Sequence, residues 1–412
     1  MQFTPKILVS KALNGLKLLK YAPVEKSLRL LLPTKSSTNL LHKYHAWRSS
    51  QYPVLQATLR QILAANPDNR GVIVFLPSLD WDRQLFQRPQ QLAKALAHQG
   101  ALVFYTQLSN HTQPYIKPLG NRLFLSACPL ELYTALPNYF LYVLTWNAKY
   151  LIKFDEPKII YDYLDDISAF KGNPRLLVEE HHRLLWSAKI VMATAQSLYQ
   201  DAITTRPDTL CVPNGVDFLH FNPSANQKAS ITPAEMNAIK KENKAIIGYY
   251  GALADWFDYD LMHQLALARH DLNFVLLGPD HDGSLAQSGL YALPNVKYLG
   301  PKPYSELPAY LSNFDVAILP FKVNKITEST SPVKLFEYMA GRKPIVSTPL
   351  REVLQYSCVL IGRDMQEFSL RLDEALAMKK DTSYITLLEQ TARDNDWNQR
   401  AVQILTTIDK HR

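Results

Sequence analysis

The chain contains few cysteines and no long apolar run, and each of these features excludes a class of protein. Its 412 residues include only three cysteines, which stand far apart at Cys128, Cys211 and Cys358. An odd number without a CxxC spacing argues against a disulfide framework or a zinc site and favours a reducing cytosol. No apolar run reaches the roughly 18 residues of a membrane-spanning helix, and no secretory signal is recognisable. The composition predicts a cytoplasmic globular protein.

Acidic residues are almost missing from the first 50 positions. This segment carries nine lysines and arginines against Glu25 alone, a surplus of +8 that equals the formal net charge of the whole chain. Between residues 6 and 21, apolar side chains recur at helical spacing on one arc and lysines lie on the other. A basic amphipathic helix can dock on an anionic membrane surface, where each Lys or Arg contributes about 1 kcal/mol.

We therefore expect residues 1–66 to form a basic helical extension, with residues 1–50 on the anionic inner face of the plasma membrane. The alternative is that this helix packs on the body of the protein or on a partner subunit. Nucleic acid is not an expected partner, because the basic region is rich in leucine and lacks a recognisable binding motif.

Beyond the extension, apolar runs of strand length alternate with helical patterns. Such alternation predicts a parallel sheet covered by helices on both faces. The expected strands of the first half are Gly71–Leu76, Ala101–Thr106, Leu141–Trp146, Lys158–Asp162, Lys189–Ala193 and Thr209–Pro213, with helices such as Pro89–His98 and Leu176–Trp186 between them. A polar stretch at residues 223–243 is interpreted as a linker, and a second alternation follows over residues 244–387.

The stretch from Glu328 to Thr348 predicts a short helix followed by a buried strand. Ser331 is a candidate N-cap, Pro332 suits the first helical position, and Gly341 suits the helix exit. Pro344–Ser347 is then expected to form the strand. The free amides and the positive dipole end of such a helix attract phosphate oxygens.

Lys334 and Glu337 lie three residues apart and therefore share one face near the start of this helix. A cation that binds phosphate and a carboxylate that accepts two ribose hydroxyls would together hold a nucleotide. The alternative is an ordinary surface Lys–Glu pair on a capped helix.

Several further segments accompany Pro332–Val346 in a fixed order along the chain. They are Val212–Asp217, Gly248–Leu253, Asn273–Pro279, Asn295–Gly300 and Phe314–Pro320. Together these segments resemble retaining glycosyltransferases of the GT-B fold, of the family 4 or group 1 kind. Within that family, Arg88–Ala93 and Tyr161–Asp166 resemble a subgroup of the teichuronic-acid-synthesis type, which serves bacterial surface polysaccharides.

The resemblance implies two Rossmann-like, doubly wound α/β domains that face each other across a cleft. Residues 67–222 would bind the acceptor and residues 244–387 the donor, while a C-terminal helix over residues 388–412 would cross back to the first domain. The implied reaction moves a hexosyl group from a nucleotide diphosphate sugar to a lipid-linked or glycan acceptor, with retention of configuration. No metal or other cofactor is implied.

The resemblance also assigns roles to individual residues. Glu337 would hold the ribose, and Lys334, with the amides near Ser331 and Pro332, would hold the diphosphate. The remaining donor contacts would come from Gly251, Gly278, Gly300, Tyr304 and Thr330. The acceptor side is inferred from residue chemistry, because the first loop lacks the paired glycines of the family. Trp81 could stack on a sugar ring, and Arg83 or Arg88 could bind a lipid diphosphate. Asp165 and Asp166 follow an apolar strand, where a carboxylate could orient an acceptor hydroxyl or assist its deprotonation. The expected catalytic set is Lys334, Glu337, Asp165 and Glu328. Three of the candidate residues have plain structural alternatives, namely a tight turn for Gly251, a packing aromatic for Tyr304 and a salt bridge for Arg88.

The chain departs from the family pattern in ways that keep alternatives open. The family's two glutamates are separated by seven residues, which places the first at Ser329, with Glu328 one position early. Either the loop shifts to bring Glu328 in, or Thr330 and Ser331 contact the sugar. The basic pair expected after the glycine turn is also absent, and Lys322 and Lys325 could replace it. The alternatives are a sugar-nucleotide epimerase, an inverting transferase and a non-catalytic GT-B scaffold subunit.

Overall fold

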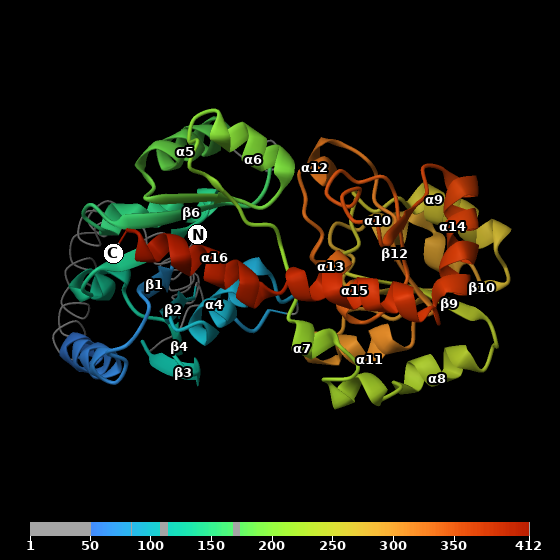
Figure 1. Cartoon of the computed structure of the whole chain (residues 1–412), viewed down its shortest axis with the longest axis horizontal. Coiled ribbons are helices and arrows are strands. Elements are labelled where there is room, and N and C mark those ends of the chain that lie inside the picture. Colours follow the sequence, from blue (N-terminus) through green and yellow to red (C-terminus); the bar gives the residue numbers. More distant parts are fainter. Residues whose placement is uncertain (1–50, 84, 108–113, 168–173, 412) are drawn as a thin grey trace, which may run out of the picture.

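A computed structural model describes residues 51–83, 85–107, 114–167 and 174–411. Two α/β bodies lie side by side, and each is built around one sheet (Figure 1). This agrees with the two Rossmann-like domains that the sequence predicts. The basic segment at residues 1–50 lies outside the described residues, so its helix and its membrane contact stay predictions. From residue 51 to residue 64 the chain is helical, and this helix buries Leu55 and Leu59 against the first body.

The first body contains an eight-stranded sheet in the order β3-β4-β2-β1-β5-β6-β7-β8. The strands are β1 (Val72–Phe75), β2 (Leu102–Thr106), β3 (Ile116–Gly120), β4 (Leu123–Ser126), β5 (Tyr139–Val143), β6 (Lys158–Tyr163), β7 (Ile190–Ala193) and β8 (Leu210–Cys211). The helices are α4 (Arg88–His98), α5 (Pro174–Ser187) and α6 (Gln196–Ile203), with 3₁₀ turns η1 (Leu130–Ala135) and η2 (Thr145–Lys153). The central strands β1 and β2 are buried along their whole length because both faces of the sheet are covered.

The structure corrects two details of the predicted sheet. The expected strand Leu141–Trp146 starts two residues earlier, at Tyr139, and ends three residues earlier, at Val143. It ends there because the Asn147 side chain accepts a hydrogen bond from the Leu144 amide and starts η2. The strands β3 and β4 were not predicted from the sequence. They form an antiparallel pair at the sheet edge, where β3 is partly exposed and can accommodate Pro118.

The second body contains a six-stranded parallel sheet in the order β11-β10-β9-β12-β13-β14. The strands are β9 (Ala245–Tyr250), β10 (Leu272–Leu277), β11 (Val296–Tyr298), β12 (Val316–Leu319), β13 (Ile345–Ser347) and β14 (Val359–Ile361). The surrounding helices are α9 (Tyr259–Ala268), α10 (Ser284–Ser288), α11 (Leu307–Ser312), α12 (Lys325–Glu328), α13 (Val333–Ala340) and α14 (Met365–Met378), with short 3₁₀ turns η5 (Leu290–Ala292) and η6 (Tyr304–Glu306).

The segment between the two bodies is folded. It contains α7 (Phe218–Phe221), η4 (Gln227–Ser230) and α8 (Ala234–Lys240). Met236 and Ile239 of α8 are buried in the core of the second body. The polar stretch that was interpreted as a linker is therefore an ordered covering of the second body, since its two apolar side chains recur at helical spacing on one face.

The C-terminal region forms two helices, whereas a single helix over residues 388–412 was predicted. The helix that crosses back to the first body starts only at Trp397. The first, α15 (Thr382–Asp394), packs on the second body, and the second, α16 (Trp397–Asp409), packs beside α4 of the first body (Figure 1). The chain breaks between them because Asp396 caps α16 by accepting the Asn398 amide hydrogen. This break lets the chain cross from one body to the other.

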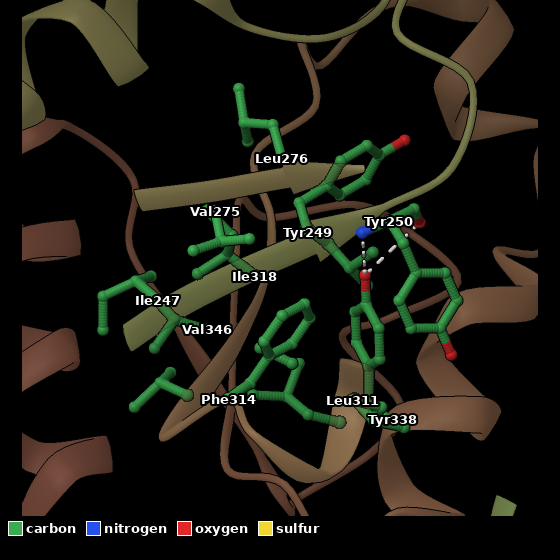
Figure 2. Packing of buried hydrophobic residues seen from close by; sticks show 14 of the residues in the cluster. Ile247, Tyr249, Tyr250, Val275, Leu276, Leu311, Phe314, Ile318, Tyr338 and Val346 are labelled. Carbon is green, nitrogen blue, oxygen red and sulfur yellow. Dashed lines mark hydrogen bonds between the residues drawn. The ribbon is translucent and has the colours of Figure 1, made fainter. Parts of the chain in front are cut away.

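The helix α13 is anchored firmly under the second sheet. Figure 2 shows Tyr338 of this helix reaching the end of β9, where its hydroxyl accepts a hydrogen bond of 3.1 Å from the Tyr250 amide. Directly after α13, a Cβ at Gly341 would lie 2.4 Å from Leu311 Cδ2, so a larger residue here would force Leu311 to shift. Gly341 ends the helix as predicted, with Arg342 taking the left-handed position after it at φ 58°.

Candidate active site

The start of α13 lies at the cleft between the two bodies, one residue later than predicted. Pro332 is the N-cap, with extended ψ of 113° and no capping side chain. Ser331 does not cap the helix, because Asn214 of the inter-body segment binds it instead. The Asn214 side chain donates to the Ser331 carbonyl at 2.6 Å, and the Asn214 amide donates to Ser331 Oγ at 3.3 Å. The predicted N-cap is therefore a contact between the two parts of the chain.

Glu337 is the most unusual charged residue of this region. Its side chain is only 3 % exposed, and its Oε2 has no hydrogen-bond partner among the described residues. Burial raises the pKa of this carboxyl, while the nearby Lys334 cation opposes the shift. The Tyr250 hydroxyl beside it is also buried and makes no hydrogen bond of normal geometry with a described residue. It still lies close enough to the carboxylate to oppose, with Lys334, the rise of the Glu337 pKa. Unpaired buried polar atoms are costly, so such a pair indicates a place that a polar ligand completes.

A pocket opens above this carboxylate and collects most of the predicted donor residues. Gly251, Gly278, Tyr304, Lys334 and Glu337 all line it. Pro301 and Lys302, in the turn after Gly300, also line it, and this turn was expected to border the base. The sequence did not identify the other lining residues, which are Leu85, Phe86, Tyr250, Leu277, Pro279 and Leu307. Tyr250 and Leu277 are the last residues of β9 and β10, and open α/β sheets bind ligands at these carboxyl ends of their strands.

The two glycines of the pocket allow their loops to touch. Gly251 and Gly278 have φ of 151° and 135°, and a Cβ at Gly278 would lie 1.7 Å from the Gly251 carbonyl oxygen. A Cβ at Gly251 would in turn approach Lys334 Cε to 3.2 Å. The glycine turn therefore brings bare backbone next to the Lys334 side chain. This arrangement suits the close approach of a phosphate group.

The other residues that were predicted to contact the donor are not among the described residues that line the pocket. Gly300 forms the turn after β11 and its carbonyl accepts the Gly278 amide hydrogen at 2.9 Å. The Thr330 hydroxyl turns back to the Ile326 carbonyl at 2.8 Å. Glu328 is exposed at the end of α12, so the structure does not pair it with Glu337.

Tyr304 is held rigidly at the edge of the pocket. Gln91 of α4 donates to its hydroxyl at 2.7 Å, and the His220 ring stacks on it with centroids 4.5 Å apart and an angle of 12°. The ring of Phe86 also packs against it at 5.2 Å. Tyr304 thus borders the pocket and contacts both the first body and the inter-body segment, while its predicted contact with the base stays a prediction.

Arg88 was predicted to contact the acceptor, and the structure contradicts this. Its side chain is 2 % exposed and binds the Asp162 carboxylate through two nitrogens at 2.7 and 3.0 Å. A third nitrogen donates to the Pro213 carbonyl and to Asn214 Oδ1, each at 3.2 Å. The structural alternative therefore holds, although the partner is a distant carboxylate and not one on the same helix. Arg88 is unavailable to a ligand.

The other acceptor candidates lie around the cleft. Trp81 is half-buried and packs edge-on against Phe86 and Tyr105, while Arg83 is exposed. Asp166 forms a 3.7 Å ion pair with Lys325 of the second body. Asp165, next to it, is half-buried, and burial together with the nearby Asp162 charge raises its pKa to about 6. A carboxyl with this pKa is suited to exchanging protons near neutral pH.

A metal centre is not evident in the described part of the chain, where no three His, Cys, Asp or Glu side chains are grouped to hold an ion. The expectation that no metal is required nevertheless stays a prediction. Among the described helices, none is long and apolar enough to cross a membrane.

Comparisons with known proteins agree with this geometry. Residues 244–377 match the family model for glycosyl transferases group 1. The putative teichuronic acid biosynthesis glycosyltransferase TuaH of Bacillus subtilis is 27 % identical over 275 residues, which cover 62 % of this chain and 68 % of TuaH.

Solved structures share the fold at low identity. Sucrose-phosphate synthase from Thermosynechococcus elongatus aligns with a TM-score of 0.57 and 14 % identity, over 83 % of this chain and 99 % of that one. HepE of Anabaena, in complex with UDP and glucose, aligns with a TM-score of 0.57 and 16 % identity, over 82 % of this chain and 98 % of that one. The protein is therefore a glycosyltransferase of the GT-B fold, and its second body is a group 1 glycosyltransferase domain.

Proposed function

We propose that the protein transfers a hexosyl group from a nucleotide diphosphate sugar to an acceptor hydroxyl, with retention of configuration at the anomeric carbon. The observation that carries the proposal is the unpaired Oε2 of Glu337, which is buried beside the pocket. Two adjacent ribose hydroxyls would donate to this carboxylate and satisfy it. The UDP and glucose bound by HepE, which has the same fold, support a donor of this class.

The start of α13 would stabilise the departing nucleotide diphosphate. In the reaction, the bond between the anomeric carbon and the β-phosphate oxygen breaks, and negative charge develops on that oxygen. Lys334 and the free amides at the start of α13 would stabilise this charge, because both place positive charge at the same end of the pocket. The acceptor oxygen forms the new bond on the same face. Asp165 is the candidate group to orient the acceptor hydroxyl or take up its proton.

We further propose that the acceptor is lipid-linked or a glycan, and that the enzyme acts in bacterial surface polysaccharide synthesis. The name of TuaH supports this role, since it describes teichuronic acid biosynthesis. Residues 1–50 would hold the enzyme on the inner face of the plasma membrane, because their +8 charge is attracted to anionic lipids. A peripheral position there would bring the cleft to a lipid-linked acceptor.

The proposal is tested by titrating the protein with UDP, GDP and dTDP in a calorimeter. We expect one of them to bind, and Glu337→Ala to weaken its binding by about 10- to 100-fold, because hydrogen bonds to a charged group contribute about 1.5–3 kcal/mol. Lys334→Ala should lower turnover with the matching nucleotide sugar. Glu374→Ala is the matched control, since Glu374 is an exposed residue of α14.

Product analysis then separates the remaining possibilities. NMR of the anomeric proton distinguishes a retained from an inverted configuration. A product released without any acceptor would indicate an epimerase. Absence of binding by all three nucleotides would contradict the donor site itself.

A further inference from the structure

The donor pocket is not formed by the second body alone. Leu85 and Phe86, which precede α4 in the first body, line it together with Tyr304, Lys334 and Glu337. The Phe86 ring lies 5.2 Å from the Tyr304 ring, with an angle of 31° between the planes. An aromatic residue of the first body thus lies inside the pocket that the proposed function assigns to the nucleotide.

Tyr304 cannot move away from this contact. Its hydroxyl is bound by Gln91, and its carbonyl oxygen is in hydrogen-bond contact with His220 Nε2 at 3.0 Å. The His220 ring stacks on it almost in parallel and covers one face. The Phe221 ring also contacts Tyr304, edge-on at 5.6 Å. Of these three ring neighbours, Phe86 is the one that belongs to the first body and lines the pocket.

The enclosed part of the pocket is largely filled by its own side chains. The unfilled volume that a water molecule can enter is about 20 Å³, which is room for about one water. The walls opposite Phe86 are fixed, because the Gly251 and Gly278 loops already touch and Lys302 is paired with Glu235 at 2.8 Å. Phe86 is half-buried, and its other neighbours are the edge of Trp81 and the Lys94 ammonium. Among these lining groups, the Phe86 ring is the one that can withdraw at low cost.

We propose that Phe86 occupies the position of the nucleobase against Tyr304, and that the nucleotide must displace it to bind. The proposal rests on the proposed donor site and adds a residue of the first body that sets its affinity. Each nucleotide that binds exchanges one aromatic contact of Tyr304 for another. The affinity therefore depends on the ring that it replaces.

The test measures the affinity of UDP, GDP and dTDP for three variants at position 86. Phe86→Ala removes the competing ring and should bind the nucleotide about 2- to 10-fold tighter, the equivalent of one lost aromatic pair. Phe86→Leu keeps most of the apolar volume and should lie between Phe86→Ala and the wild type. Phe86→Trp offers a larger ring to Tyr304 and should bind more weakly than the wild type. Phe124→Ala, at a half-buried ring near the far edge of the first sheet, is the matched control.

The fluorescence of Trp81 provides a second measurement. If Phe86 had only a structural role, adding nucleotide would not change this fluorescence through Phe86. The Trp81 ring lies edge-on to Phe86 at 5.3 Å, so withdrawal of Phe86 should alter the tryptophan emission when nucleotide is added. The change should disappear in Trp81→Phe and in Phe86→Ala. Equal affinities across the position 86 variants, or tighter binding by the tryptophan variant, would overturn the proposal. Absence of nucleotide binding by the wild type and every variant would instead overturn the donor site on which it rests.

Discussion

Replacement of Glu337 by glutamine should stabilise the folded protein while it weakens nucleotide binding. Glutamine has nearly the same shape but no charge, so it removes the burial penalty that raises the pKa of this carboxyl. Burying a charge costs more than burying a neutral amide, so we expect the free energy of unfolding near neutral pH to rise by about 1 kcal/mol or more. Each kcal/mol should raise the melting temperature by about 2–4 °C.

The pH dependence of this difference has a definite sign. Because the pKa of Glu337 in the folded protein lies above the ordinary 4.5, the folded protein binds this proton more tightly than the unfolded chain does. The stability of the wild type therefore falls as pH rises from about 4.5 through the folded pKa. The glutamine variant lacks this contribution. The two proteins should melt at similar temperatures near about pH 4 and diverge as the solution becomes neutral.

Thermal melts between about pH 4 and 8, with and without UDP, check this reasoning. Glu374→Gln is the control, because Glu374 is exposed and pairs with Arg371 on the helix surface. Added nucleotide should raise the melting temperature of the wild type more than that of the Glu337→Gln protein, since its hydroxyls satisfy the carboxylate. A glutamine variant that is less stable than the wild type at every pH would refute the view that Glu337 is unpaired in the free enzyme.

Three other perturbations follow from the same structure. Arg88→Ala should lower the free energy of unfolding in urea by about 3–5 kcal/mol, because it leaves the Asp162 charge buried without its partner, whereas the exposed Arg83→Ala should have little effect. Turnover of the wild type should rise as pH increases through about 6, and Asp165→Asn should lose this rise in the pH profile. A variant without residues 1–50 should keep its UDP affinity but lose binding to anionic liposomes, and raising the salt from about 0.1 to 1 M should weaken liposome binding by the full chain. Liposome binding that survives the truncation would place the membrane contact elsewhere.

The donor helix could be predicted from the sequence because its signals are local. Lys334 and Glu337 share a face whatever surrounds them, and Gly341 marks the exit within the same ten residues. The position of its first turn could not be predicted in this way. Ser331 is a good N-cap residue in isolation, but Asn214, which is 117 positions away in the chain, binds both its carbonyl and its hydroxyl. The start of α13 therefore depends on Asn214, a residue that is distant in the sequence.

The first body was harder to interpret for the same reason. An arginine that binds a carboxylate through two nitrogens looks, in sequence, like an arginine that binds a diphosphate, because both partners present paired oxygens. Only the structure, in which the Arg88 side chain of α4 reaches Asp162 of β6, shows that this carboxylate is the partner. The sequence did not indicate that Phe86 lines the donor pocket, because an isolated aromatic residue before a helix is usually a core residue. Its place in the donor pocket depends on how the two bodies meet.

Phe86, just before α4, and Arg88, at its start, both contact the donor region, but the two contacts differ greatly in strength. Arg88 is fully paired and buried, and through Asn214 it is joined to Ser331 at the start of α13. Breaking such a pair costs about 3–5 kcal/mol. Phe86 makes a half-buried ring contact with Tyr304, and such aromatic pairs contribute about 0.5–1.5 kcal/mol. When a nucleotide enters, the weaker contact must yield first. The Arg88 connection then keeps the two bodies in register while the Phe86 ring withdraws, so we expect donor binding to rearrange the pocket without separating the domains.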